Sequence, residues 1–147
     1  DGMGCYSELA LRRALRNSSM LSSDVSAGYD PAYGEAFEKK NAAYLGRGIV
    51  LNKFTGARGN PVPTMPMQSM LQEFAGFLMI TMLLSRQQSW KVDFGGGGTI
   101  AYIAALYGME VIDSGVAVLS MHAPWEVTSK ADVYEAYKAY KAFLLDA

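Results

Sequence analysis

Hydrophobic and polar residues follow two different spacings along the chain, and these spacings predict both helices and strands. Residues 6–16 repeat Leu and Ala at intervals of three and four, with arginines on the other side, which is typical of an amphipathic helix. Residues 116–120 instead form a short apolar run with two β-branched residues, which indicates a buried strand. Along the whole chain, the pattern predicts helices at residues 6–16, 67–86, 100–107 and 129–145, and strands at residues 20–25, 49–54, 90–94, 109–113 and 116–119.

Strands that alternate with helices predict an α/β fold, a three-layer α/β/α arrangement with a mixed sheet between the helices. The chain has 147 residues, half of them apolar, which is enough for one domain with its own core. The longest apolar run, residues 74–84, has 11 residues and is too short to cross a bilayer. The helix predicted around this run is apolar on all sides, so we expect it to be buried in a core or in an oligomer interface.

The net charge, the cysteine content and the first residues of the chain argue against several classes of protein. The net charge of −1 argues against a nucleic-acid-binding protein, which would show a basic stripe. Cys5 is the only cysteine, so we expect neither a disulfide framework nor a thiolate metal cluster. The first residues lack the basic and apolar regions of a secretion signal. We therefore expect a cytoplasmic protein with no membrane and no nucleic-acid partner.

Two polar residues stand where predicted strands end. His122, the only histidine, follows the strand at residues 116–120 and precedes a turn that contains Pro124. Asp24 falls near the C-terminal end of the strand at residues 20–25. In open α/β sheets ligands bind at the edge where strands end, and both residue types bind metals. Two structural interpretations remain open: His122 as a hydrogen-bonded core histidine, and Asp24 as a turn former or helix cap.

A glycine loop lies between a predicted strand and a predicted helix. Four consecutive glycines, residues 95–98, are followed by Thr99 and by the helix at residues 100–107. This layout can bring backbone N–H groups to an anion or a carbonyl group. No Gly-Lys-Ser/Thr follows the glycines, so the loop is not a P-loop, and its spacing does not fit a dinucleotide-binding fingerprint. A flexible turn that lets a helix start close to a sheet is the structural alternative.

Three stretches, taken together, resemble one family of enzymes. They are MLSSDVSAGYDPAY at residues 20–33, KVDFGGGGTIA at residues 91–101 and VAVLSMHAPWEVTSKAD at residues 116–132. Their order and spacing are similar to the motifs of the aspartyl aminopeptidase and vacuolar aminopeptidase I family of dizinc metallopeptidases. The resemblance covers most of the chain, whereas residues 61–89 depart from the family pattern. It implies a zinc-peptidase type of fold and a homo-oligomer, often a tetrahedral dodecamer.

The resemblance also implies which residues of this chain bind metal. The family holds two zinc ions with five side chains, in the order His, Asp, Glu, Asp, His, and by position Asp24 and His122 match the last two. The first three ligands and the Glu that acts as general base would lie upstream of Asp1. The chain thus resembles the C-terminal portion of a single catalytic domain, residues 1–147, without the family's inserted dimerisation domain. We expect this portion to be inactive alone.

The reaction that the resemblance implies is removal of single N-terminal residues from peptides at a dinuclear zinc site. The glycine loop would line the substrate pocket with backbone groups, and Lys53 or Asn52 would face the side chain of the residue removed. A hypothesis of a different class is a non-catalytic α/β module that self-associates through the helix at residues 67–86 and binds a small anion at the glycine loop. The candidate substrate-binding residues are Lys53, Asp93, Gly96, Gly97, Gly98 and Thr99.

Overall fold

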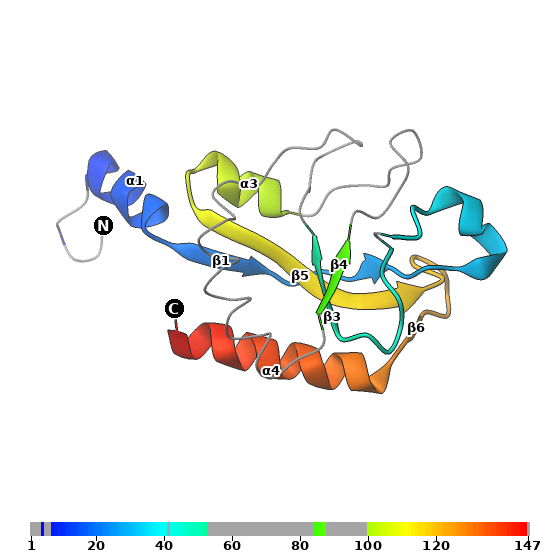
Figure 1. The fold of residues 1–147 in the computed structure, drawn as a ribbon. Coiled ribbons are helices and arrows are strands. Elements are labelled where there is room, and N and C mark those ends of the chain that lie inside the picture. The colour runs from blue at the N-terminus through cyan, green and yellow to red at the C-terminus, as the bar shows by residue number, and fades with distance from the viewer. Residues whose placement is uncertain (1–3, 5–6, 41, 53–83, 88–99, 147) are drawn as a thin grey trace.

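The strand β5 (Glu110–Leu119), ten residues long, is the central strand of the described sheet and pairs with β1, β2, β3 and β6. The computed structural model describes residues 4, 7–40, 42–52, 84–87 and 100–146, and all structural statements below concern these residues (Figure 1). The other elements are α1 (Glu8–Arg16), β1 (Ser19–Ser22), β2 (Ser26–Ala27), the 3-10 helix η1 (Pro31–Ala36), β3 (Ile49–Asn52), β4 (Leu84–Gln87), α3 (Ala101–Leu106), β6 (Val127–Thr128) and α4 (Lys130–Asp146).

The pairing of β5 makes the sheet mixed, as the sequence predicts. β1 and β2 run parallel to β5, at its beginning and towards its end, while β3 and β6 pair with it in the antiparallel direction. β4 extends the sheet by pairing in parallel with β3. Most residues of β5 are buried, which is expected of a strand with neighbours on both sides.

Side chains on β3 alternate between two cores on opposite faces of the sheet. Ile49 is fully buried against Ala136 and Ala139 of α4, whereas Val50 packs with Ala117 in a second cluster. Successive residues of a strand point to opposite faces, so one short strand contributes to both cores. Figure 1 shows α4 along one side of β5 and α3 on the other. The predicted arrangement, with helices on both sides of a mixed sheet, is confirmed.

One buried carboxylate ties the start of α4 to the turn before β3. Asp132 is fully buried, and its two oxygens accept hydrogen bonds from the N–H groups of Gly46 (2.7 Å) and Gly48 (2.8 Å). Both glycines have a left-handed backbone, with φ of 81° and 82°, which other residues rarely adopt. The N–H of Asp132 donates to Oγ of Ser129 at 3.4 Å, as expected at a helix start. These bonds fix β3 relative to α4.

The predicted helix at residues 67–86 is wrong at its C-terminal end. Leu84–Gln87 form the strand β4, because their backbone pairs in register with β3. Pairing with a neighbouring strand can override the local preference of an apolar sequence. The rest of that prediction, residues 67–83, lies outside the described residues.

The two strands predicted at residues 109–113 and 116–119 form a single strand. Ser114 and Gly115, which suggest a break in the sequence, stay in register opposite residues of β3, and both are buried. The strand predicted at residues 90–94 lies outside the described residues.

The other three predicted helices are confirmed, with small shifts in their bounds, as α1, α3 and α4. In the part of the chain that the structure describes, none of the helices combines the length and the hydropathy needed to span a membrane.

Candidate metal centre

Asp24 lies in the β1–β2 link (residues 23–25), which runs along β5 from one short parallel strand to the next. Its side chain is exposed, and its Oδ1 accepts a hydrogen bond from the N–H of Val25 at 2.8 Å. Its carbonyl oxygen occupies the space that a Cβ on Gly115 would need. The backbone of Asp24 therefore lies directly on the face of β5, while its carboxylate is open to solvent.

His122 lies in the tight loop that follows β5, which we call the His122 loop (residues 120–126). Ser120 and His122 both have a left-handed backbone, with φ of 56° and 67°. This conformation costs a residue other than glycine about 1–3 kcal/mol and persists only where surrounding contacts hold it. Here the N–H of His122 donates to Oε1 of Glu126 (2.6 Å), and the N–H of Ala123 donates to the carbonyl of Ser120 (2.9 Å). The exposed imidazole thus stands on a backbone that is fixed locally.

The two candidate ligands lie along the same strand, and their chemistry fits zinc. Asp24 contacts the middle of β5 and His122 follows its end. A carboxylate and an imidazole are both zinc ligands, and neither Oδ2 of Asp24 nor the ring of His122 hydrogen-bonds to another group in the described part of the chain.

The described residues alone do not make a complete metal site. Within the described ranges, no group of three or more His, Cys, Asp or Glu side chains is placed to hold a metal ion. That Asp24 and His122 share one dizinc site stays a prediction. Asn52, the alternative to Lys53 for contact with the substrate side chain, is described and lies in β3. The other candidate substrate-binding residues lie outside the described residues: Lys53, Asp93, Gly96, Gly97, Gly98 and Thr99.

A polar cluster that the sequence analysis missed lies directly after the β1–β2 link. The side-chain amide of Asn52 donates to Oγ of Ser26 (2.9 Å) and to Oδ2 of Asp113 (3.5 Å). Ser26 and Asp113 are buried, and Asn52 is half-buried. The only trace of this cluster in the sequence is Asp113 itself, a carboxylate that directly follows the apolar residues Val111 and Ile112 in β5. The cluster connects β2, β3 and β5 next to Asp24.

A second contact lies directly before Asp24 and comes from α4. Oγ of Ser23 donates to the hydroxyl of Tyr140 at 2.7 Å, and that hydroxyl donates in turn to the carbonyl of Ser114 at 3.4 Å. Ser23 and Tyr140 are 117 residues apart, so no spacing in the sequence pairs them. The link that carries Asp24 is therefore bound on both sides by residues distant in the sequence.

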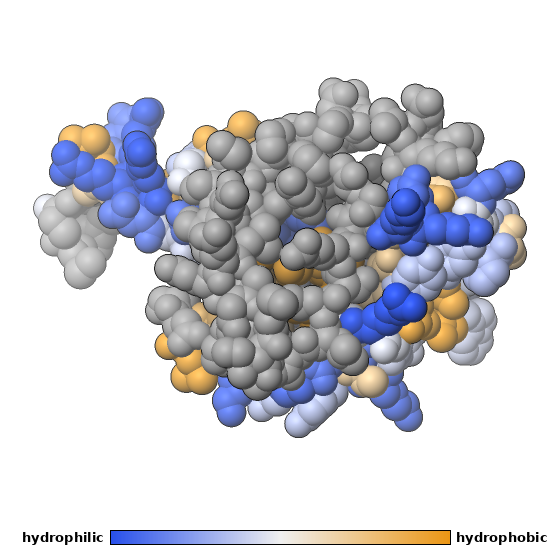
Figure 2. All heavy atoms as spheres, in the orientation of Figure 1, coloured by the Kyte–Doolittle hydropathy of each residue, from blue (hydrophilic) through white to orange (hydrophobic). Residues whose placement is uncertain are grey.

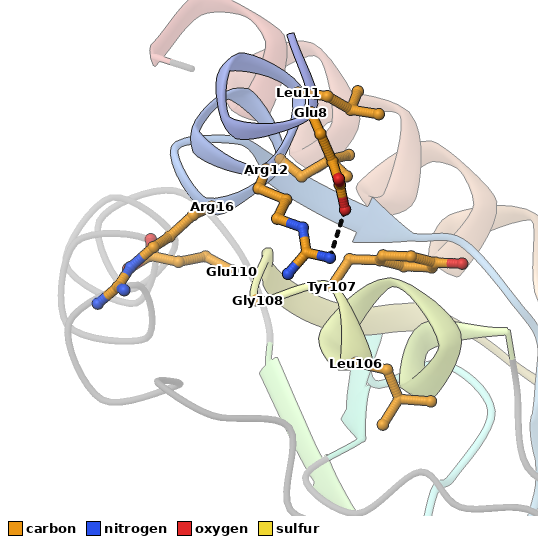
Figure 3. Close-up of a pocket in the computed structure, with 9 residues that line it drawn as sticks. Glu8, Leu11, Arg12, Arg16, Leu106, Tyr107, Gly108 and Glu110 are labelled. Carbon is orange, nitrogen blue, oxygen red and sulfur yellow. Dashed lines mark hydrogen bonds and ion pairs between the residues drawn. The ribbon is translucent and has the colours of Figure 1, made fainter.

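A groove of about 990 Å³ lies between α1, α3 and the start of β5, away from both candidate ligands. Figure 3 shows Arg12 and Glu8, one turn apart on α1, joined along one wall of the groove by an ion pair of 2.6 Å. Both side chains are largely exposed, so this pair contributes at most about 1 kcal/mol. None of the residues of α1 is buried, and Figure 2 shows mostly hydrophilic atoms on its visible face. Because the groove and His122 lie at opposite ends of β5, the groove is not the predicted site.

The fold and these side chains define a class: an α/β domain with an exposed Asp and an exposed His beside its central strand. The model of the Aminopeptidase I zinc metalloprotease (M18) family matches residues 4–144, and the chain belongs to this family. The family resemblance inferred from the three motifs is confirmed.

Relatives and solved structures agree with this assignment. A probable M18 family aminopeptidase 1 from Clostridium acetobutylicum is 54% identical over 148 residues, which cover 96% of this chain and 30% of the relative. The crystal structure of an M18 aminopeptidase from Thermotoga maritima matches with a TM-score of 0.82 and 39% identity, over 95% of this chain and 31% of that chain. The mApe1 dodecamer from S. cerevisiae matches with a TM-score of 0.69 and 26% identity, over 91% and 28% of the two chains. The chain thus spans about 30% of the length of these relatives.

Proposed function

We propose that this chain is the C-terminal portion of the catalytic domain of a zinc aminopeptidase that removes single N-terminal residues from peptides. The proposal is supported by membership of a zinc metalloprotease family and, above all, by the exposed carboxylate of Asp24 and the exposed imidazole of His122 along one strand. The remaining ligands and the general base would come from the rest of the full-length polypeptide.

In this proposal each of the two side chains holds one of two zinc ions. When bound, such a pair would lower the pKa of a water molecule and polarise the scissile carbonyl group. Asp24 supplies an oxygen ligand from the β1–β2 link, and His122 supplies a nitrogen ligand from a loop whose backbone Glu126 holds. The glycine loop at residues 95–99, with Lys53 and Asp93, would contact the peptide.

The proposal extends to assembly and location. A homo-oligomer, as large as a dodecamer, is supported by the dodecameric structure of the yeast relative. A cytoplasmic location is supported by the single cysteine, because disulfide bonds are rare in that compartment.

The test is substitution of each ligand in the full-length protein. Asp24→Asn keeps the shape of the side chain but removes its charge, and His122→Asn keeps a residue that tolerates a left-handed backbone. Loss of a group that only supports a metal ligand costs about 10–100-fold, so loss of the ligand itself should reduce peptidase activity by about 100-fold or more. Bound zinc, measured by elemental mass spectrometry, should also fall by up to one ion per subunit.

The matched control for Asp24→Asn is Glu35→Gln, which neutralises another exposed carboxylate and should change neither zinc nor activity. Residues 1–147 alone should bind zinc weakly and show no activity, since catalytic zinc usually has about three protein ligands. Wild-type zinc content and activity in both ligand variants would contradict the proposal.

A further inference from the structure

We propose that Tyr140, Asn52 and Gly115 are positioning residues, which hold the β1–β2 link so that the Asp24 carboxylate is already in place before metal binds. This inference rests on the proposed function, in which Asp24 binds zinc. In this proposal, residues of α4, β3 and β5 act on the metal site indirectly. They contact the β1–β2 link and do not contact the metal.

The first contact precedes Asp24. Oγ of Ser23 donates to the Tyr140 hydroxyl at 2.7 Å, and the same hydroxyl reaches the carbonyl of Ser114 at 3.4 Å. Tyr140 is half-buried, and its ring packs against the core cluster around Ile49. The hydroxyl is therefore held by a fixed ring and anchors the link to the helix α4.

The second contact follows Asp24. Ser26 is buried, and its hydroxyl lies 2.9 Å from the side-chain nitrogen and 3.3 Å from the side-chain oxygen of Asn52. The amide of Asn52 lies 3.5 Å from Oδ2 of the fully buried Asp113. The far end of the link is thus anchored to β3 and β5 through the buried residues Ser26 and Asp113.

The third contact lies under Asp24 itself. The Asp24 carbonyl oxygen occupies the position of a Cβ on Gly115, so any other residue there would push the link away from the sheet. Glycine is required at this position by the close approach of two backbones.

These contacts matter because the link itself is exposed. Asp24 is open to solvent and Val25 is 38% exposed, so packing within the link cannot hold it. Ordering a free loop on binding costs affinity, and a metal site needs its ligands held within about 0.5 Å of their final positions. The contacts of Tyr140, Asn52 and Gly115 hold the β1–β2 link in place before metal binds, so this cost of ordering is avoided.

The test uses the zinc affinity of the full-length protein, measured by competition with a chromophoric chelator, and the visible absorption spectrum of the cobalt-substituted protein. Tyr140→Phe removes only the hydroxyl and should weaken binding of one ion by about tenfold or more, with a changed cobalt spectrum. Tyr137→Phe is the matched control, because Tyr137 lies one turn earlier on α4 and is 58% exposed, and it should leave both readouts unchanged. Gly115→Ala should weaken binding at least as much as Tyr140→Phe, and circular dichroism of each variant checks that it is folded.

The ligand variant Asp24→Asn separates the two proposals. If Asp24→Asn loses zinc while folded Tyr140→Phe retains wild-type affinity and an unchanged spectrum, the positioning proposal is overturned and the proposed function stands. If Asp24→Asn itself retains both zinc ions, Asp24 is not a zinc ligand. The proposed function is then contradicted, and the positioning proposal that rests on it is contradicted with it. Should Gly115→Ala not fold, the folded Tyr140→Phe variant still decides the outcome, and Asn52→Ala should weaken zinc binding in the same way.

Discussion

The β1–β2 link and the His122 loop lie along the same strand but are held by different kinds of contact. The His122 loop holds itself, because Glu126 binds the backbone of a residue four positions away. The β1–β2 link depends on Tyr140, which is 117 residues from Ser23, and on Asn52, which is 26 residues from Ser26. A local loop keeps its shape when the surrounding fold loosens, whereas a loop held from a distance requires the elements around it to be assembled.

The largest effect is expected from Asp132→Ala, which removes the carboxylate that joins β3 to α4. Two N–H groups, of Gly46 and Gly48, lose their acceptor, and each unsatisfied group costs about 1–3 kcal/mol. We expect the free energy of unfolding to fall by about 2–6 kcal/mol in denaturant titration of the full-length protein. Hydrogen exchange should increase at residues 46–48 and in the β1–β2 link before it increases in the His122 loop.

The control for this variant is Asp30→Ala. The side chain of Asp30 accepts one hydrogen bond, from the N–H of Ala32 at 2.9 Å, in a less buried position, and its loss should cost about 1 kcal/mol. If hydrogen exchange in Asp132→Ala increases equally in the β1–β2 link and in the His122 loop, the two segments do not differ in how they are held.

Glu126→Ala tests the local side of the comparison. Without the carboxylate, the N–H of His122 loses its partner at 2.6 Å and the left-handed loop loses a tether. Zinc affinity should fall by about tenfold, as for other groups that hold a metal ligand in place. Glu126→Gln keeps an oxygen acceptor and should restore most of the affinity.

Combining Glu126→Ala with Tyr140→Phe asks whether the two loops are independent. The two residues share no partner among the described contacts, so their effects on zinc binding should multiply. A double variant much weaker or much stronger than this product would show that the loops are coupled.

The sequence predicts the parts of this site that depend on neighbours along the chain. The run of residues 116–120, Pro124 and the Ser129 helix start place His122 after a buried strand, and the structure confirms that placement. The two strands predicted around residues 114–115 are one strand, because register with β3 is set by pairing and not by local pattern. For the same reason the sequence analysis missed β4.

The supports of Asp24 could not be predicted from the sequence. Tyr140 is one of several tyrosines on a helix, and the sequence does not show which of them faces the sheet. Gly115 gives no sign that another backbone occupies the space above it. Such contacts follow from the three-dimensional arrangement of β1, β3, β5 and α4, which periodicity alone does not specify.

The smallest effect is expected from Ser120→Gly. Glycine adopts the left-handed backbone at φ 56° without steric cost, so this variant should be up to about 1 kcal/mol more stable. Ser19→Gly is the matched control in the extended strand β1, where glycine should destabilise by about 0.5–1 kcal/mol. Thermal unfolding of both variants beside the wild type measures the difference, and a loss of stability in Ser120→Gly would argue against strain in the His122 loop.

The central claim is that Asp24 and His122 belong to one dizinc site, and anomalous X-ray diffraction at the zinc edge from crystals of the full-length protein tests it most directly. We predict two zinc peaks about 3.5–4 Å apart, one bonded to each side chain, with the carboxylate and the imidazole within roughly 5–8 Å of each other. Two zinc peaks bonded to other residues, with Asp24 and His122 on opposite sides of the sheet, would contradict the account.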